Sequence, residues 1–178
     1  MPQLIHRSSS NDTPGQESFM TTDKEGAPKR GDQHAALAIF LGRWRAEGKS
    51  YGGPNQPDED PKSTSELWVS THTGIWHSGD FFLVQDERAM VGGKPFDTLS
   101  VMGVDANTGS YFARSFENHG FYRRYDASVS GRVWTFTGSM ERARIEFSAD
   151  WRTQTIAWEW RPKDRWLPLC DRVAGRED

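Results

Sequence analysis

The sequence predicts a mostly β protein: a single antiparallel meander β-barrel of about ten strands, preceded by one short helix. Turn-forming Gly, Asn, Asp and Pro recur about every ten residues beyond position 42, and β-branched or aromatic residues fill the intervals. Only one segment has the apolar spacing of a helix. With 8 Trp, 10 Phe and 4 Tyr among its 178 residues, the chain has the material for one sizeable core.

The first part of the chain differs from the rest in composition. Residues 1–31 contain three consecutive serines, three prolines and three glycines, with few apolar residues. Such a segment buries too little apolar surface to offset its ordering entropy. We therefore expect a disordered leader over 1–31 and a barrel domain over 32–178.

The one helix is expected at 32–41, at the start of the barrel domain. Asp32 can cap its N-terminus, and Gly42 follows as a stop signal. Leu37 and Phe40 fall on one apolar stripe. A helix this short is marginal alone and must dock on another element.

The remaining chain reads as strands separated by turns. The expected strands are 43–51, 64–71, 75–78, 80–90, 97–105, 110–117, 120–128, 132–139, 142–149, 154–161 and 165–173. A meander of this length is expected to close into a barrel, because closure removes both exposed edges. The alternative β-sandwich needs long crossover connections, and only the polar, proline-rich loop 52–62 is long enough.

Composition excludes several classes of function. No run of 18 apolar residues exists, so no membrane partner is expected. The net charge of −3 gives no electrostatic case for nucleic acid. The single cysteine, Cys170, cannot form an internal disulfide, and its apolar neighbours suggest a buried, unreactive thiol. The first residues lack the apolar core of a secretory signal, and we expect a cytoplasmic protein.

A short motif opens the first strand. Gly42-Arg43-Trp44 resembles the N-terminal Gly-x-Trp signature of the lipocalin and calycin barrels. The resemblance implies that Trp44 lies across the closed end of the barrel, with a basic residue of the last strand packed on its ring. Arg172 is the first candidate for that cation–π partner and Arg165 the second.

A longer pattern resembles one bacterial family. It comprises His34, Leu37, Leu41-Gly42-x-Trp44, Glu47-Gly48, the segments 82–86 and 102–105, Thr108-Gly109-x-Tyr111 and the segment 134–138. These residues, within about 34–172, resemble the DUF1579 domain family, which has no assigned function. The resemblance implies a calycin-like barrel with an interior cavity, and it supplies no catalytic residue.

Histidines give no metal site. His72 and His77 are five residues apart, so they would point to opposite faces of a strand, and no His-Glu-x-x-His motif exists. We expect no metal and no cofactor. Small ten-stranded barrels of the nitrobindin type hold haem through one histidine, and His119 or His77 is the candidate for that alternative.

Arginines are interleaved with aromatic residues in the later strands. The set is Arg114, Arg123, Arg124, Arg142 and Arg144. The simplest interpretation is a solvated outer face with cross-strand ion pairs. The alternative is that one or two point inward and orient a carboxylate or carbonyl. Arg114 faces inward only if Phe112 does, and Arg124 shares a face with Tyr122.

We therefore expect a small-molecule-binding barrel that holds a mostly apolar or aromatic organic ligand in an aromatic-lined cavity. The cavity candidates are Trp44, Trp76, His77, Phe112, Arg114, His119, Tyr122, Arg124, Trp134, Trp158 and Trp160. One alternative is an isomerase or cyclase of a biosynthetic pathway that uses an interior Arg, His or Glu. The second is the haem-binding barrel. The protein could also form a homodimer, which the sequence does not decide.

Overall fold

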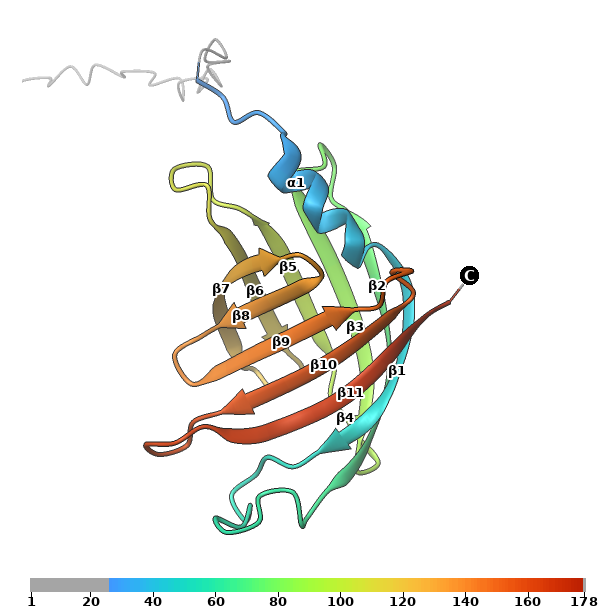
Figure 1. Cartoon of the computed structure of the whole chain (residues 1–178), viewed down its shortest axis with the longest axis vertical. Helices are drawn as coiled ribbons and strands as arrows, with labels where there is room; N and C mark the ends of the chain where they lie inside the picture. The colour runs from blue at the N-terminus through green and yellow to red at the C-terminus, as the bar shows by residue number, and fades with distance from the viewer. Residues whose placement is uncertain (1–25, 178) are drawn as a thin grey trace, which may run out of the picture.

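Antiparallel strands that follow one another in the chain wind into a closed ring. The computed structural model describes residues 26–177. The elements are α1 (Asp32–Ala36), η1 (Leu37–Phe40), β1 (Gly42–Ser50), β2 (Glu66–Trp76), β3 (Phe82–Val91), β4 (Lys94–Pro95), β5 (Thr98–Val104), β6 (Tyr111–Glu117), β7 (Tyr122–Ser130), β8 (Val133–Thr137), β9 (Glu141–Phe147), β10 (Thr153–Trp160) and β11 (Leu167–Glu177). The pairs β1–β11, β1–β2 and β2–β3 close a ten-stranded barrel (Figure 1). This confirms the predicted fold class.

Several boundaries differ from those expected. The segments 64–71 and 75–78 are one continuous strand, β2, because Gly74 stays within the sheet. A Cβ at Gly74 would lie 2.1 Å from the carbonyl oxygen of Phe40, so the glycine lets the helical segment approach the barrel wall. The helix is α-helical only to Ala36 and then tightens into the 3-10 turn η1.

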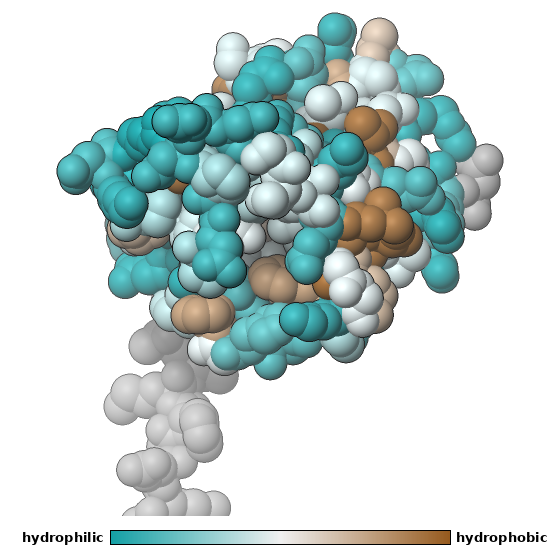
Figure 2. Space-filling model, turned by 90° about the horizontal axis from the view of Figure 1, so that it is seen from below, coloured by the Kyte–Doolittle hydropathy of each residue, from teal (hydrophilic) through white to brown (hydrophobic). Residues whose placement is uncertain are grey.

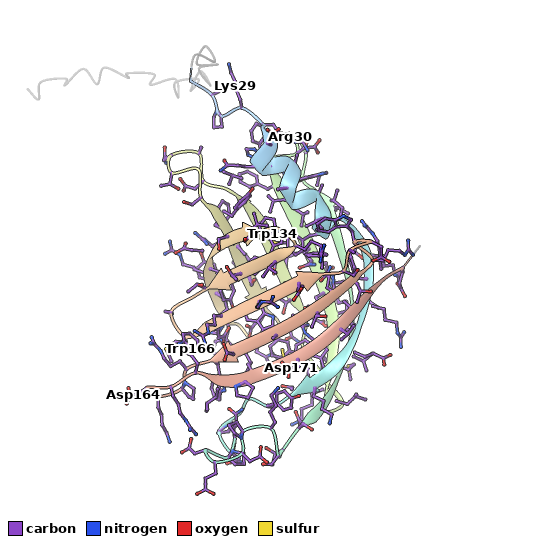
Figure 3. All side chains as sticks on the ribbon, viewed as in Figure 1. Lys29, Arg30, Trp134, Asp164, Trp166 and Asp171 are labelled. Carbon is purple, nitrogen blue, oxygen red and sulfur yellow. The ribbon has the colours of Figure 1, made fainter. Side chains whose placement is uncertain are left out.

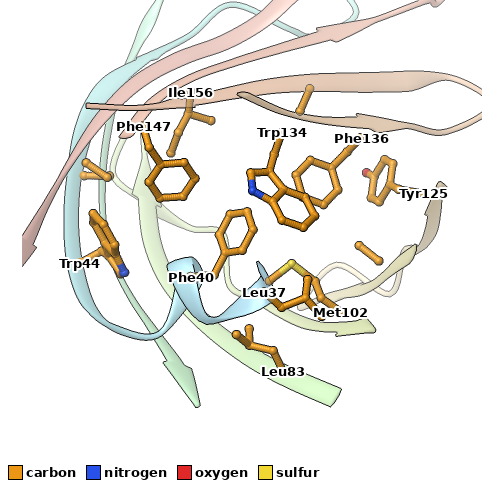
Figure 4. Packing of buried hydrophobic residues seen from close by; sticks show 14 residues of the cluster. Leu37, Phe40, Trp44, Leu83, Met102, Tyr125, Trp134, Phe136, Phe147 and Ile156 are labelled. Carbon is orange, nitrogen blue, oxygen red and sulfur yellow. The ribbon is translucent and has the colours of Figure 1, made fainter. Parts of the chain in front are cut away.

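The helical segment covers one end of the barrel (Figure 1). Leu37 and Phe40 are almost completely buried. The ring of Phe40 meets Trp134 at 5.2 Å and Phe147 at 5.3 Å, both edge-on (Figure 4). Gly42 then turns the chain into β1 with a φ of +93°. This end of the barrel is therefore filled by side chains and holds the main core.

Trp44 lies in this core, as the Gly-x-Trp motif implies, but its cationic partner differs from the prediction. The guanidinium of Arg176 lies 5.1 Å from the centre of the Trp44 ring. Arg176 Nη2 and Trp44 Nε1 both donate to the carbonyl oxygen of Leu41, at 2.6 and 3.3 Å. The sequence pattern ends the last strand at 173, which makes Arg172 and Arg165 the candidates; β11 instead continues to Glu177 and carries Arg176.

The leader predicted over 1–31 falls mainly on residues 1–25, which lie outside the described residues. Within 26–31, Arg30 lies next to the start of α1 (Figure 3). Its guanidinium lies 5.3 Å from the centre of the Trp76 ring, and its Nε donates to the carbonyl oxygen of Asp80. No helix within 26–177 has the length and apolarity to cross a membrane.

Candidate functional site

A cavity of about 540 Å³ occupies the half of the barrel away from the helix. It opens at the end opposite α1, where the 51–65 loop and the β10–β11 turn form part of the rim. Figure 2 views the molecule from this end and shows mostly hydrophilic side chains around it. Gln56 ties the loop to the barrel: its Oε1 accepts a hydrogen bond from Trp160 Nε1 at 2.7 Å, and its Nε2 donates to the carbonyl oxygen of Pro168 at 2.7 Å.

One wall of the cavity is apolar. It is formed by Phe136 on β8, Ile145 on β9, and Ile156 and Trp158 on β10. The Trp158 ring meets Tyr125 edge-on at 5.2 Å. This wall offers a surface on which flat, apolar groups can pack.

The adjoining part of the wall, from β11 to β3, is polar and contains a buried ion pair. Arg172 Nη1 on β11 lies 2.6 Å from Glu87 Oε1 on β3, and both side chains are largely buried. The Arg172 guanidinium also lies 4.3 Å from the centre of the Trp68 ring. Gly48 makes room for this arrangement, since a Cβ there would meet the backbone of Asp171 and Arg172.

His72 lies beside this ion pair. Its ring is stacked on Trp44 at 6.1 Å, and it is opposite Glu87 in the β2–β3 register. The pKa of His72 is lowered to about 4, mainly by burial; nearby Glu87 opposes this shift, while Arg172 adds to it. The imidazole is therefore neutral at pH 7.

A belt of polar side chains connects the Arg172–Glu87 ion pair to the cavity mouth. Gln85 on β3, Ser100 on β5, Ser115 on β6 and Arg123 on β7 are neighbours in the strand register. The Ser100 and Ser115 hydroxyls lie 2.8 Å apart. All four residues line the cavity. The cavity is therefore amphipathic, since polar side chains and the apolar side chains of β8, β9 and β10 share its wall.

Four ionisable residues form a cluster near the mouth. Arg123 pairs with Glu117 at 3.4 Å and with Glu141 at 3.3 Å. The Tyr125 hydroxyl donates to Glu141 Oε2 at 2.7 Å. Burial raises the pKa of Glu117, although Arg123 partly opposes the shift. This glutamate is the group in the cavity best suited to exchange a proton with a ligand.

Three buried nitrogens of the polar wall lack a hydrogen-bond partner within residues 26–177. They are His72 Nε2, Gln154 Nε2 and Arg172 Nε. A fourth, Arg123 Nε, has no hydrogen bond but lies in the ion pair with Glu117. Buried polar groups are normally satisfied by protein, water or ligand.

Of the eleven residues predicted for the cavity, the structure places His119, Trp158 and Trp160 on its wall. The others lie elsewhere. Trp44 and Trp134 are packed in the core beneath the helix (Figure 4). Trp76 lies near the helix-covered end under Arg30.

The remaining five predicted residues lie outside the barrel wall. They are His77, Phe112, Arg114, Tyr122 and Arg124. Phe112 packs on Phe82, Tyr122 stacks on Phe116, and Arg114 donates to the carbonyl oxygens of Ala113 and Tyr125. Arg124 is exposed, and His77 is an exposed turn residue.

The alternation of side chains along β6 explains where two of these residues lie. On β6 the inward residues are Tyr111, Ala113, Ser115 and Glu117, so Phe112 and Arg114 point outward together. Arg114 thus shares a face with Phe112, and that face is the outer one.

Sequence reasoning missed several residues that line the cavity. They are Trp68, His72, Glu87, Glu117, Tyr125, Glu141, Gln154 and Arg172. The signal for Trp68 and His72 is the two-residue period, which places both side chains on the same face of one strand. In the β1–β2 register, His72 is opposite Trp44 and Trp68 is opposite Gly48.

The described residues were also compared with three other kinds of site: a metal site, a reactive thiol and a haem site. Residues 26–177 contain no group of three or more His, Cys, Asp or Glu side chains arranged to hold a metal ion. Cys170 is buried beside Trp68 and Ala89, and burial raises the pKa of its thiol to about 11. For the haem alternative, His77 does not reach the cavity, whereas His119 lies at its mouth against Phe96 at 5.2 Å.

Comparisons with known proteins give a family and a fold. The family model DUF1579, described as a protein of unknown function, matches residues 29–161. The crystal structure of Rv2717c from M. tuberculosis is similar with a TM-score of 0.61 and 15% identity, over 84% of this chain and 100% of that one. An S-type phycobiliprotein lyase, CPES from Guillardia theta, gives a TM-score of 0.46 and 10% identity, over 81% and 92% of the two chains. No curated protein matches the sequence.

Proposed function

The chain belongs to the DUF1579 family, whose description assigns no function, and from the geometry of its cavity we propose that it binds a small, mostly apolar organic molecule inside the barrel. The observation that carries this proposal is the amphipathic cavity of about 540 Å³, open at one end. Cavities of a few hundred Å³ with apolar walls and a few polar groups are typical of small-molecule sites.

The two ends of the barrel support a binding role in different ways. The helix-covered end is closely filled by Phe40, Trp134 and Phe147, so it provides a rigid base. The other half keeps its space although a filled core would be more stable. The unfilled volume and the buried polar groups together favour a ligand over a purely structural role.

Tryptophan fluorescence gives a direct test. Trp158 and Trp160 line the cavity, so a bound aromatic ligand quenches or shifts their emission saturably. We expect dissociation constants of about 1–100 μM for small apolar probes. Trp158→Leu weakens binding, while Trp166→Leu does not, because Trp166 packs outside the cavity between Arg142 and Arg161. A panel of neutral aromatic probes without any saturable change would contradict the proposal. A Soret band on adding haemin that is lost in His119→Ala would favour the haem alternative instead.

An enzymatic role is the second candidate, and Glu117 is the observation that favours it. This carboxyl lines the cavity and pairs with Arg123, and burial raises its pKa. An isomerase or cyclase needs such a group to move a proton to or from a bound molecule. Once a ligand is identified, its conversion can be followed by mass spectrometry. An enzyme loses conversion in Glu117→Gln but keeps binding, whereas a carrier releases the ligand unchanged in both forms.

A further inference from the structure

The deep part of the cavity contains three polar residues that are almost completely buried and have an unpartnered nitrogen. His72, Gln154 and Arg172 are each less than 9% exposed, and each lines the cavity. The unpartnered atoms are the side-chain nitrogens His72 Nε2, Gln154 Nε2 and Arg172 Nε, within residues 26–177. Leaving such groups unsatisfied destabilises a protein, so a polar partner is expected there.

The strand register places these residues around one area of the wall. Gln154 on β10 is opposite Ala174 on β11, two residues along the same face from Arg172. Ala174 is opposite Ala46 on β1 in turn. Arg172 reaches from β11 to Glu87, which is the register neighbour of His72. Ile156, which is opposite Arg172 and two residues from Gln154 on β10, lines the cavity beside both of these polar side chains.

The chemistry of the three groups favours a hydrogen-bond acceptor as their partner. Arg172 Nε can only donate, and the amide end of Gln154 donates as placed. The neutral His72 can donate or accept through its free ring nitrogen. A carbonyl oxygen has two lone pairs and can accept two such hydrogen bonds at once.

The charges around the cavity argue against a carboxylate in this position. The Arg172 guanidinium is already paired with Glu87 at 2.6 Å. Four glutamates and three cations, Lys94, Arg123 and Arg172, line the cavity, which leaves one excess negative charge. A ligand anion would add to that excess in a poorly solvated space.

We propose that the deep end of the cavity binds the carbonyl group of a neutral, largely apolar ligand through Arg172 and Gln154, with His72 beside them. The apolar remainder of the ligand packs on Ile156, the register neighbour of Arg172, and on Trp158 next to it on β10. This inference rests on the proposed binding function and defines its ligand class: neutral ketones, esters or amides with a flat or branched apolar body.

Three probes of the same shape test the class. Acetylnaphthalene, isopropenylnaphthalene and naphthoate, substituted at the same ring position, present a carbonyl, a hydrocarbon and a carboxylate. We expect the ketone to bind about tenfold more tightly than the hydrocarbon in calorimetric titrations, as one buried hydrogen bond of about 1.4 kcal/mol requires. Naphthoate should bind more weakly than the ketone.

Two variants locate the carbonyl. Gln154→Met keeps the length of the side chain and removes its amide, so the ketone preference over the hydrocarbon falls by at least threefold. The same variant keeps or raises the melting temperature, because it removes an unpartnered buried group. Ile145→Val, on the apolar wall, is the control and weakens both neutral probes equally.

The outcomes separate the inference from the function on which it rests. Equal binding of ketone and hydrocarbon, or a ketone preference untouched by Gln154→Met, overturns the carbonyl site and leaves the binding barrel standing. Tightest binding of naphthoate shows an anion site and overturns the neutral class. If none of the three probes binds, the proposed function itself fails and the inference fails with it.

Discussion

Arg172 and Glu87 form a 2.6 Å ion pair that spans two intervening strands, β1 and β2, across the inside of the barrel. Both side chains are largely shielded from water. Burying two charges is costly, and the cost is offset only while both partners are present. The pair therefore couples opposite sides of the β1–β2 hairpin and defines the polar half of the cavity.

Removing one member of this pair is expected to be strongly destabilising. Glu87→Gln leaves the Arg172 charge buried without a counter-ion and should lower the free energy of unfolding by about 3–5 kcal/mol. Asp86, the next residue on β3, faces outward and pairs with Arg88 at 3.0 Å in solvent. Asp86→Asn should cost less than about 1 kcal/mol in the same urea titrations. Equal costs for the two substitutions would contradict the assigned role of the buried pair.

The neutral state of His72 should appear as a pH dependence of stability. Its pKa is about 4 in the folded protein and about 6.5 when unfolded, so the unfolded chain binds the extra proton between these values. Stability is complete above about pH 6.5 and falls as the pH drops toward 4, by about 3 kcal/mol in all.

The variant His72→Phe keeps a ring against Trp44 and removes this titration. Urea unfolding at pH 7 and pH 4.5 should show a smaller loss for the variant than for the natural protein. Glu87 and Arg172 face His72 in both proteins, so their contributions cancel in the comparison. Identical pH slopes would show that His72 does not carry the effect.

Trp44 should be a stability residue rather than a ligand contact. It is completely buried, and Trp44→Ala should cost about 3–5 kcal/mol of unfolding free energy. Arg176→Met keeps the contact with the ring but removes the hydrogen bond to Leu41, and should cost about 1 kcal/mol. Neither substitution should change the affinity for a probe by more than about twofold. A loss of probe binding with unchanged stability would show that Trp44 contacts the ligand and would contradict this prediction.

Gly48 should not tolerate a side chain. An added Cβ would lie 2.0 Å from the carbonyl oxygen of Asp171 on the paired strand, and backbone cannot move aside cheaply. We expect Gly48→Ala to cost about 3 kcal/mol or more. Gly175, also in the β1–β11 pair, has open space at the same position. Gly175→Ala should be neutral or stabilising by up to about 1 kcal/mol in thermal unfolding.

The fold was largely predictable because its signals are local. Turn residues, the short apolar stripe of the helix and the Gly42-x-Trp44 motif each depend on a few adjacent positions. Boundaries that depend on distant contacts were wrong. Gly74 looked like a turn residue, yet it is required inside β2 for the approach of Phe40.

The site was less predictable because β6 reverses the usual distribution of polarity. Its outward residues include Phe112 and Phe116, and its inward residues include Ser115 and Glu117. A binary pattern places aromatic residues inside a barrel, so it selects the wrong face wherever a cavity is polar. The partners Arg172 and Glu87 are 85 residues apart in the chain, and no local pattern links them.

For the ligand that we propose, the closed base gives the rim a role in the rates of entry and release. Since α1 and η1 cover one end, a ligand enters and leaves past the same 51–65 loop and β10–β11 turn (Figure 1). Asp58 of the loop pairs with Arg165 of the turn at 3.3 Å, and neither residue lines the cavity. A contact that restrains the rim without touching the bound molecule changes the association and dissociation rate constants by the same factor. The residence time of a ligand can thus be adjusted at this rim while its equilibrium occupancy stays fixed by the walls.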